Sequence, residues 1–111
     1  MENFEWAHEL SCAITVCDRE ANVVYQNLKA IKTFQSYGDL IGKNLKDCHG
    51  ESSWEMIQRM IETGESNSYT IEKAGVKKLI HQTPWHKNGE VCGLVEFSIE
   101  LPGELPHFIR K

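Results

Sequence analysis

The feature that most constrains the fold is a hairpin signal in the second half of the chain. Asn88-Gly89 separates two long segments, 76–85 and 91–101, that are rich in apolar and β-branched residues. Both turn residues tolerate the positive φ that a two-residue hairpin requires, so the pair predicts antiparallel pairing of the two segments. A further turn at Ala74-Gly75 would join a strand over 66–73 to them. The sequence therefore predicts a three-stranded antiparallel meander.

Two shorter strands and a short helix are expected before this meander. Segments 13–17 and 23–26 are β-branched and apolar, and the polar stretch 18–22 between them suits a turn, which predicts a hairpin. Asn27 is then placed to cap a short helix that runs from Leu28 to about Phe34. The glycine-punctuated stretch after it predicts short helical turns and loop.

The clearest helix follows this stretch. Residues 52–55 have the serine and glutamate spacing of a capping box, and Gly64 stands where a C-terminal cap belongs. Trp54, Ile57 and Ile61 recur at helical spacing and form an apolar stripe that should pack on a sheet. We therefore expect an α+β fold, with a five-stranded antiparallel sheet and short helices inserted between strands 2 and 3 and packed on one face.

Length and charge narrow the classes of function. The chain has 111 residues, enough for one domain, and its net charge of −4 with scattered lysines argues against nucleic-acid binding. It has no phosphate loop, nucleophile elbow, H-E-x-x-H or kinase motif, so we expect no enzyme. The four cysteines form no C-x-x-C pair, which predicts reduced, mostly buried thiols.

Short segments are expected to flank the domain at both ends of the chain. We expect a flanking helix or cap over 1–10, the domain itself over 11–101, and a tail over 102–111 that leaves the sheet at Pro102. The acidic start lacks the features of a signal peptide, and no apolar run approaches the length that spans a membrane. The sequence therefore predicts a cytoplasmic protein that does not associate with membranes.

An ordered series of motifs resembles the PAS family. Segment 17–27 looks like the opening hairpin of that family, in which an aspartate begins the turn and an asparagine ends the second strand. Alanine, phenylalanine and glycine then recur as in the family, at Ala30, Phe34 and Gly38. Segment 40–45 is similar to the hydrophobic-Gly-Lys-x-hydrophobic entry to the middle helices, and 89–95 to the last hairpin. The resemblance covers 11–101 and implies the PAS fold.

The resemblance also implies a role. PAS domains bind small molecules, haem or flavin between sheet and helices, or serve only in dimerisation, and the fold alone does not choose among these. We expect a sensory domain that binds a ligand between helix 54–63 and the sheet and relays occupancy by protein association. A ligand-free dimerisation scaffold and a haem-based redox or gas sensor that uses Cys48 and His49 are the alternatives.

The expected ligand-binding residues come from the long helix, the segment before it and one strand. They are Cys48, His49, Trp54, Ile57, Ile61, His81, Thr83 and Trp85. Strand alternation places His81, Thr83 and Trp85 on one face, which we take to be the pocket-facing surface of the sheet. Glu96 is noted separately as a carboxylate between two apolar strand residues, where it is open to desolvation.

Cofactor chemistry remains open at this point. Cys48-His49 offers thiolate and imidazole ligands to haem iron, although haem PAS domains commonly take their ligand from the long helix, where 54–63 has no histidine. Light-sensing PAS relatives carry Gly-x-Asn-Cys, and this chain has Leu45 at the cysteine position, so no flavin adduct is expected. The spacing of its cysteines and histidines predicts no zinc site.

Association is expected through the second face of the sheet. Both faces of the last strand are partly apolar, so the face without the inserted helices should also be covered. The candidate dimer face is formed by Phe4, Trp6, Leu10, Phe97 and Ile99. We therefore expect a homodimer, with a separate signalling output protein as a further partner.

Overall fold

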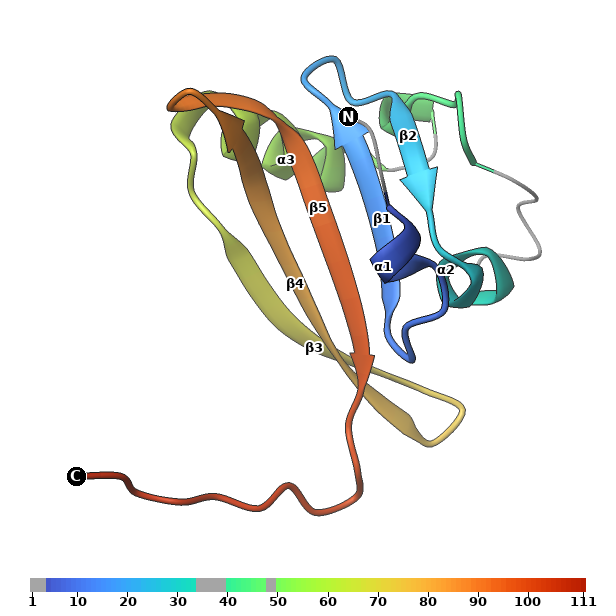
Figure 1. Cartoon of the computed structure of the whole chain (residues 1–111), viewed down its shortest axis with the longest axis vertical. Helices are drawn as coiled ribbons and strands as arrows, with labels where there is room; N and C mark the ends of the chain where they lie inside the picture. Colours follow the sequence, from blue (N-terminus) through green and yellow to red (C-terminus); the bar gives the residue numbers. More distant parts are fainter. Residues whose placement is uncertain (1–3, 34–39, 48–49) are drawn as a thin grey trace.

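The structure is a computed structural model that describes residues 4–33, 40–47 and 50–111. Five antiparallel strands form one sheet in the order β2-β1-β5-β4-β3 (Figure 1). The strands are β1 (Ala13–Asp18), β2 (Val23–Gln26), β3 (Asn67–Lys73), β4 (Val76–Lys87) and β5 (Glu90–Glu100). The helical elements are α1 (Glu5–His8), α2 (Leu28–Thr33), η2 (Leu45–Asp47) and α3 (Glu51–Thr63). The predicted α+β class and antiparallel sheet are confirmed.

The two predicted turns of the meander form as two-residue turns with positive φ. Ala74 and Gly75 have φ of 51° and 79°, and Asn88 and Gly89 have φ of 53° and 81°. Such turns match the right-handed twist of the strands they join. The β3–β4–β5 meander is therefore fixed locally by its turn residues.

The long helix ends as expected and begins differently. Gly64 has φ of 77°, and its N–H donates to the Met60 carbonyl at 2.8 Å, which confirms the predicted C-terminal cap. At the other end Gly50 occupies the N-cap position, and no side chain caps the helix. Ser52 lies inside the first turn of α3, so the predicted capping box is wrong.

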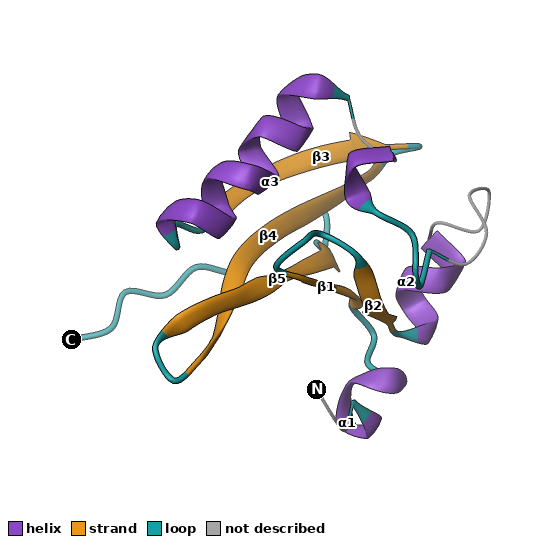
Figure 2. Ribbon diagram, turned by 90° about the horizontal axis from the view of Figure 1, so that it is seen from above, coloured by secondary structure: helices purple, strands orange, loops and turns teal. Residues whose placement is uncertain are grey.

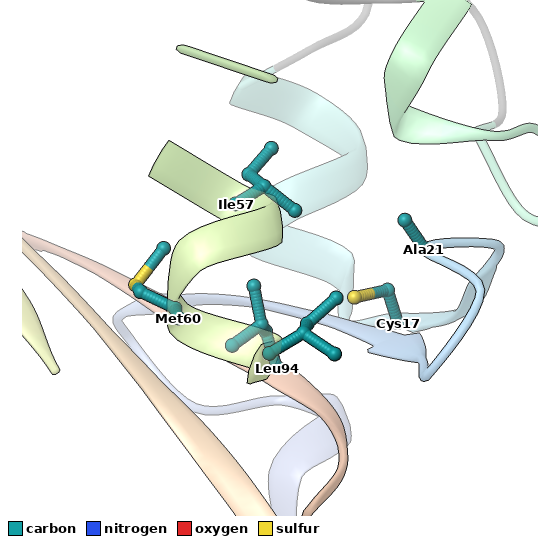
Figure 3. Packing of buried hydrophobic residues seen from close by; sticks show 6 residues of the cluster. Cys17, Ala21, Ile57, Met60 and Leu94 are labelled. Atoms are coloured by element: carbon teal, nitrogen blue, oxygen red, sulfur yellow. The ribbon is translucent and has the colours of Figure 1, made fainter. Parts of the chain in front are cut away.

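Two apolar clusters lie on opposite faces of the sheet. Figure 2 shows α3 and α1, the helices that contribute to them, on opposite sides of the sheet. On one side, here the α3 face, Ile57 and Met60 of α3 pack against Leu94 and Cys17 (Figure 3). On the other side, the α1 face, Ala7 of α1 is fully buried in a cluster with Ile14 and Val16. The prediction that the second face is covered is thus met in part by α1.

One buried amide holds three elements together. Asn27 is fully buried, and its Oδ1 accepts hydrogen bonds from the N–H groups of Ile14 in β1 and Ala30 in α2, both at 3.0 Å. Its Nδ2 donates to the carbonyls of Ala7 and Cys12, both at 2.9 Å. The predicted cap of α2 is confirmed, and the same side chain also fastens α1 to the sheet.

A close approach between β1, β4 and β5 requires Gly93. Trp85 Nε1 donates to the Cys17 carbonyl at 3.0 Å directly beside it, and Gly93 has φ of 157°. A Cβ atom at this position would overlap the Cys17 carbonyl oxygen and lie 2.6 Å from Trp85 Nε1. No side chain larger than hydrogen fits here.

The chain after β5 has no regular structure. The Leu101 N–H still bonds to the Lys77 carbonyl at 2.8 Å, and the following segment leaves the sheet (Figure 1). Its apolar side chains Leu105, Phe108 and Ile109 are exposed by 61%, 69% and 85%. In the parts of the chain that the structure describes, no helix is both long and apolar enough to cross a membrane.

Replacement of Asn27 should test its role as a common anchor. We expect Asn27→Ala to lower the free energy of unfolding by about 2–4 kcal/mol, because it removes a helix cap and leaves buried backbone groups without partners. Asn27→Ser keeps the capping oxygen but loses the two donated bonds, so its loss should be smaller. Urea unfolding followed by circular dichroism measures both, and equal stability of Asn27→Ala and the parent would contradict the assignment.

Replacement of Gly93 should disrupt the sheet centre. We expect Gly93→Ala to cost at least about 3 kcal/mol, because the added methyl must displace backbone or the Trp85 ring. Gly103→Ala is the matched control, since a Cβ there meets no atom within 4 Å. Thermal unfolding of the two variants provides the comparison, and a Gly93→Ala protein as stable as Gly103→Ala would refute the steric argument.

Candidate functional site

A row of five polar side chains crosses the α3 face of the sheet. Directly opposed residues of antiparallel strands point to the same face, so the strand register identifies the row. Its members, one from each strand in spatial order, are Gln26, Thr15, Glu96, Gln82 and Asn67. We call this set the polar row.

Hydrogen bonds link the members of the polar row. Asn67 Nδ2 donates to Gln82 Oε1 at 3.1 Å, and Gln82 Nε2 donates to Glu96 Oε1 at 2.8 Å. On the other side of Glu96, Gln26 Nε2 donates to Thr15 Oγ1 at 3.4 Å. The two amides on the β3 side are thus both oriented with their N–H groups toward the Glu96 carboxylate.

The middle of the row borders a cavity beneath α3. This α3 cavity has a volume of about 50 Å³ and is lined on its apolar side by Cys17, Leu45, Ile57 and Leu94. Thr15, Gln82 and Glu96 supply its polar side. The cavity therefore presents hydrogen-bonding groups within largely apolar walls, which is the usual pattern of a small-molecule site.

Two open grooves adjoin the α3 cavity. One, of about 340 Å³, shares Ile57 and Gln82 with the cavity and runs between α3 and β3 past Met56 and Tyr69. The other, of about 450 Å³, shares Glu96 with the cavity and runs toward the β3–β4 turn. We call the second one the hairpin groove. Glu96 stands where the cavity and the hairpin groove meet.

Burial controls the titration of two side chains at this site. Burial raises the pKa of the Cys17 thiol from about 9 to about 11, so at neutral pH the group is a thiol and a poor nucleophile or metal ligand. Burial, and secondarily the charge of Glu96, also raises the pKa of Tyr69. Near neutral pH neither side chain adds a charge beside the Glu96 carboxylate.

The three predicted site residues on α3 differ in their position relative to the α3 cavity. Ile57 lines the α3 cavity, whereas Ile61 is buried in the apolar cluster and lines no part of that cavity. Trp54 is half-buried at the edge of the same cluster. Cys48 and His49 lie outside the described residues.

The predicted strand residues lie on the other face of the sheet. His81 and Thr83 pair with Phe97 and Val95, and Trp85 packs with these two apolar residues in the cluster on the α1 face. The interpretation of His81, Thr83 and Trp85 as the pocket-facing surface is therefore wrong. Each has a hydrogen bond within the domain: His81 with Ser68 Oγ at 2.6 Å, Thr83 with Ser66 at 2.8 Å, and Trp85 with the Cys17 carbonyl.

A β-bulge on β5 reverses the alternation of side chains along that strand. Trp85 is opposite Gly93, whereas His86 is opposite Val91, so Cys92 is an extra residue on β5. Val91 consequently packs on the α3 face and Val95 on the α1 face, although they are four residues apart in one strand. Simple alternation along β5 assigns both to the same face.

None of the five members of the polar row was predicted as a site residue. A signal existed for one pair, because a two-residue turn at Ala74-Gly75 places Asn67 opposite Gln82 by counting alone. The bond from Gln82 to Glu96 could not be found in this way, since the bulge shifts the register of β4 on β5. Glu96 was recognised as a carboxylate among apolar residues, without its partner.

The described residues of this site do not fit haem. No histidine is among the cavity-lining residues named above, and Cys17 is a protonated thiol. Cofactor pockets usually enclose about 300–1,000 Å³, against about 50 Å³ in the α3 cavity. Across the described ranges of the chain, no group of three or more His, Cys, Asp or Glu side chains could hold a metal ion.

Comparison with known proteins finds similar structures but no similar sequences. No family model and no curated protein matches the chain. The PAS domain of histidine kinase ThkA aligns with a TM-score of 0.65 and 17% identity over 81% of this chain and 99% of that one. The Aer2 receptor from Vibrio cholerae, a dual PAS-heme oxygen sensor, aligns with a TM-score of 0.62 and 15% identity over 83% and 96% of the two chains.

A third similar structure is that of VqmA bound to DPO. It aligns with a TM-score of 0.65 and 18% identity, over 88% of this chain and 55% of that one. VqmA from Vibrio cholerae is described as a dimer. At these identities the likeness shows a common fold, which confirms the fold expected from the sequence motifs.

The raised pKa of Cys17 should make stability depend on pH. Between pH 9 and 11 the unfolded chain loses this thiol proton while the folded chain keeps it, so the free energy of unfolding should fall as pH rises. We expect Cys17→Ala to show a shallower fall between pH 8 and 10 in urea unfolding. Cys92→Ala, outside the buried cluster, is the control, and identical slopes for the parent and Cys17→Ala would contradict the assignment.

Proposed function

We propose that this chain, which has the PAS fold, is a sensory domain that binds a small molecule in the α3 cavity. The observation that carries the proposal is the polar row, which brings hydrogen-bonding side chains beneath α3 into an otherwise apolar cavity. A purely structural core would fill this space with apolar side chains, because buried polar groups add little stability. The proposal is also supported by similar folds that bind DPO in VqmA and haem in Aer2.

The binding residues of this proposal differ from those expected from the sequence. Ile57 of α3 and Leu94 of β5 form the apolar walls, and Thr15, Gln82 and Glu96 form the polar side. Thr15 accepts a hydrogen bond from Gln26, which leaves its own hydroxyl proton for a ligand. Cys48 and His49 stay candidates from the sequence alone.

Hydrogen bonds of Gln26 and Asn27 link the polar row of the cavity to the α1 face. The polar row ends at Gln26, whose Oε1 accepts from the Leu40 N–H at 3.3 Å. The next residue, Asn27, crosses to the other face and holds the Ala7 carbonyl of α1. We propose that a change in the row on ligand binding alters the position of α1.

Association with a partner protein would then depend on the position of α1. In the expected dimer face, Trp6, Leu10 and Ile99 are exposed by 66%, 40% and 36%. Phe4 instead stacks on Tyr25 with ring centroids 4.2 Å apart, so it packs within its own domain. We propose a homodimer through the exposed side chains, a separate output protein as further partner, and the cytoplasm as the location.

A pair of identical substitutions on opposite faces tests the site. Native mass spectrometry of freshly purified protein should detect a retained small molecule. Thr15→Val should weaken its binding by about five- to tenfold, which is the usual value of one hydrogen bond. Thr83→Val, the same change on the α1 face, should leave binding unchanged.

The opposite outcomes separate the alternatives. Loss of the molecule in Thr83→Val but not in Thr15→Val would show that the binding site lies on the α1 face instead. A protein that retains no molecule and binds none in a metabolite screen would be the ligand-free association scaffold. A Soret band in the visible spectrum would favour the haem sensor, and its loss in His49→Ala would identify the ligand.

A further inference from the structure

We propose, on the basis of this proposed function, that the ligand is a small molecule with an apolar body and an N–H donor, and that Glu96 recognises the donor. The inference depends on the direction of the hydrogen bonds in the polar row, on the position of Glu96, and on the walls of the cavity. Each of these limits the chemistry of the ligand independently.

The hydrogen bonds of the row give Glu96 spare acceptor capacity. Gln82 uses its carbonyl to accept from Asn67 and its amide N–H to donate to Glu96 Oε1. A carboxylate can accept about four hydrogen bonds and donates none. Within the described ranges the side chains supply one donor to this carboxylate, so a ligand at Glu96 must bring donors.

The position of Glu96 makes this capacity available to a ligand. Glu96 lines both the α3 cavity and the hairpin groove, and its side chain is half-buried. The ion pair that joins Lys29 to Glu100 at 3.4 Å does not involve Glu96. A ligand donor would therefore find the carboxylate reachable from the groove and without a bound lysine.

The charge at the site disfavours anionic ligands. An anion in the α3 cavity would lie beside the Glu96 carboxylate, and the other polar lining groups, Thr15 and Gln82, are neutral. Unfavourable charge pairs in a partly desolvated site cost several kcal/mol. A neutral or cationic N–H group instead gains a charge-assisted hydrogen bond to the carboxylate.

The remaining walls define the body of the ligand. Ile57 and Leu45 approach from the helical side, and Leu94 and Cys17 from the sheet. A cavity of about 50 Å³ holds the equivalent of roughly three to five water molecules. A compact apolar body with its donor at one edge satisfies both the walls and Glu96.

Two probes of nearly the same shape test the ligand class. 2-Aminopyridine carries an amino donor where 2-methylpyridine carries a methyl group. In ¹H–¹⁵N NMR titrations of the full chain, 2-aminopyridine should shift the amides of Thr15, Leu94 and Glu96. It should bind at least about tenfold more tightly than 2-methylpyridine, which is the usual effect of a hydrogen bond to a charged group.

Substitution of the carboxylate completes the test. Glu96→Gln keeps the size of the side chain and an oxygen that accepts from Gln82, but it removes the charge. It should weaken binding of 2-aminopyridine by about tenfold and leave 2-methylpyridine unchanged. Glu90→Gln on the same strand, outside both the α3 cavity and the hairpin groove, is the control and should leave both affinities unchanged.

The outcomes separate this inference from the function on which it rests. Equal affinity for the two probes, or unchanged 2-aminopyridine binding in Glu96→Gln, overturns the assigned ligand class while a retained molecule still supports a binding site. If neither probe shifts any cavity amide and native mass spectrometry detects no molecule, both the ligand class and the proposed binding function are overturned.

Discussion

The buried Asn27 side chain is the interaction on which the other elements depend. Its amide has two donor N–H groups and one acceptor oxygen, and all of them bond to backbone groups of the surrounding elements. One side chain therefore fixes the start of β1, the start of α2 and the position of α1 on the sheet. These contacts join α1 and α2 to β1.

The polar row and the close approach at Gly93 are two consequences of the same register. The bulge at Cys92 brings Gly93 against the Cys17 carbonyl and also places Glu96 opposite Gln82. Apolar packing on both faces then fixes the sheet, with Leu94 beneath α3 and Val95 beneath α1. A carboxylate held in this way is oriented before any ligand arrives, which lowers the cost of binding.

The sensory role that we propose depends on how these features are combined. The cavity lies on the α3 face and the exposed Trp6 belongs to α1 on the opposite face, while Gln26 and Asn27 are neighbours in the chain. A ligand that reorients the row therefore acts within one residue of the anchor of α1. We propose that this arrangement couples the site to the surface through hydrogen bonds.

The sequence by itself determined the local elements: the turn residues fixed both hairpins of the meander, Asn27 fixed the cap of α2, and Gly64 fixed the end of α3. These depend on φ preferences and on bonds between near neighbours, which the sequence states directly. Only the tertiary structure decided which face of the sheet lies beneath α3. Apolar residues occupy both faces of β1 and β5, so alternation along β4 did not show which face lies beneath α3, and His81, Thr83 and Trp85 were assigned to the wrong one. The extra residue at Cys92 shifts the register of β4 on β5, so the polar row became visible only from the strand register.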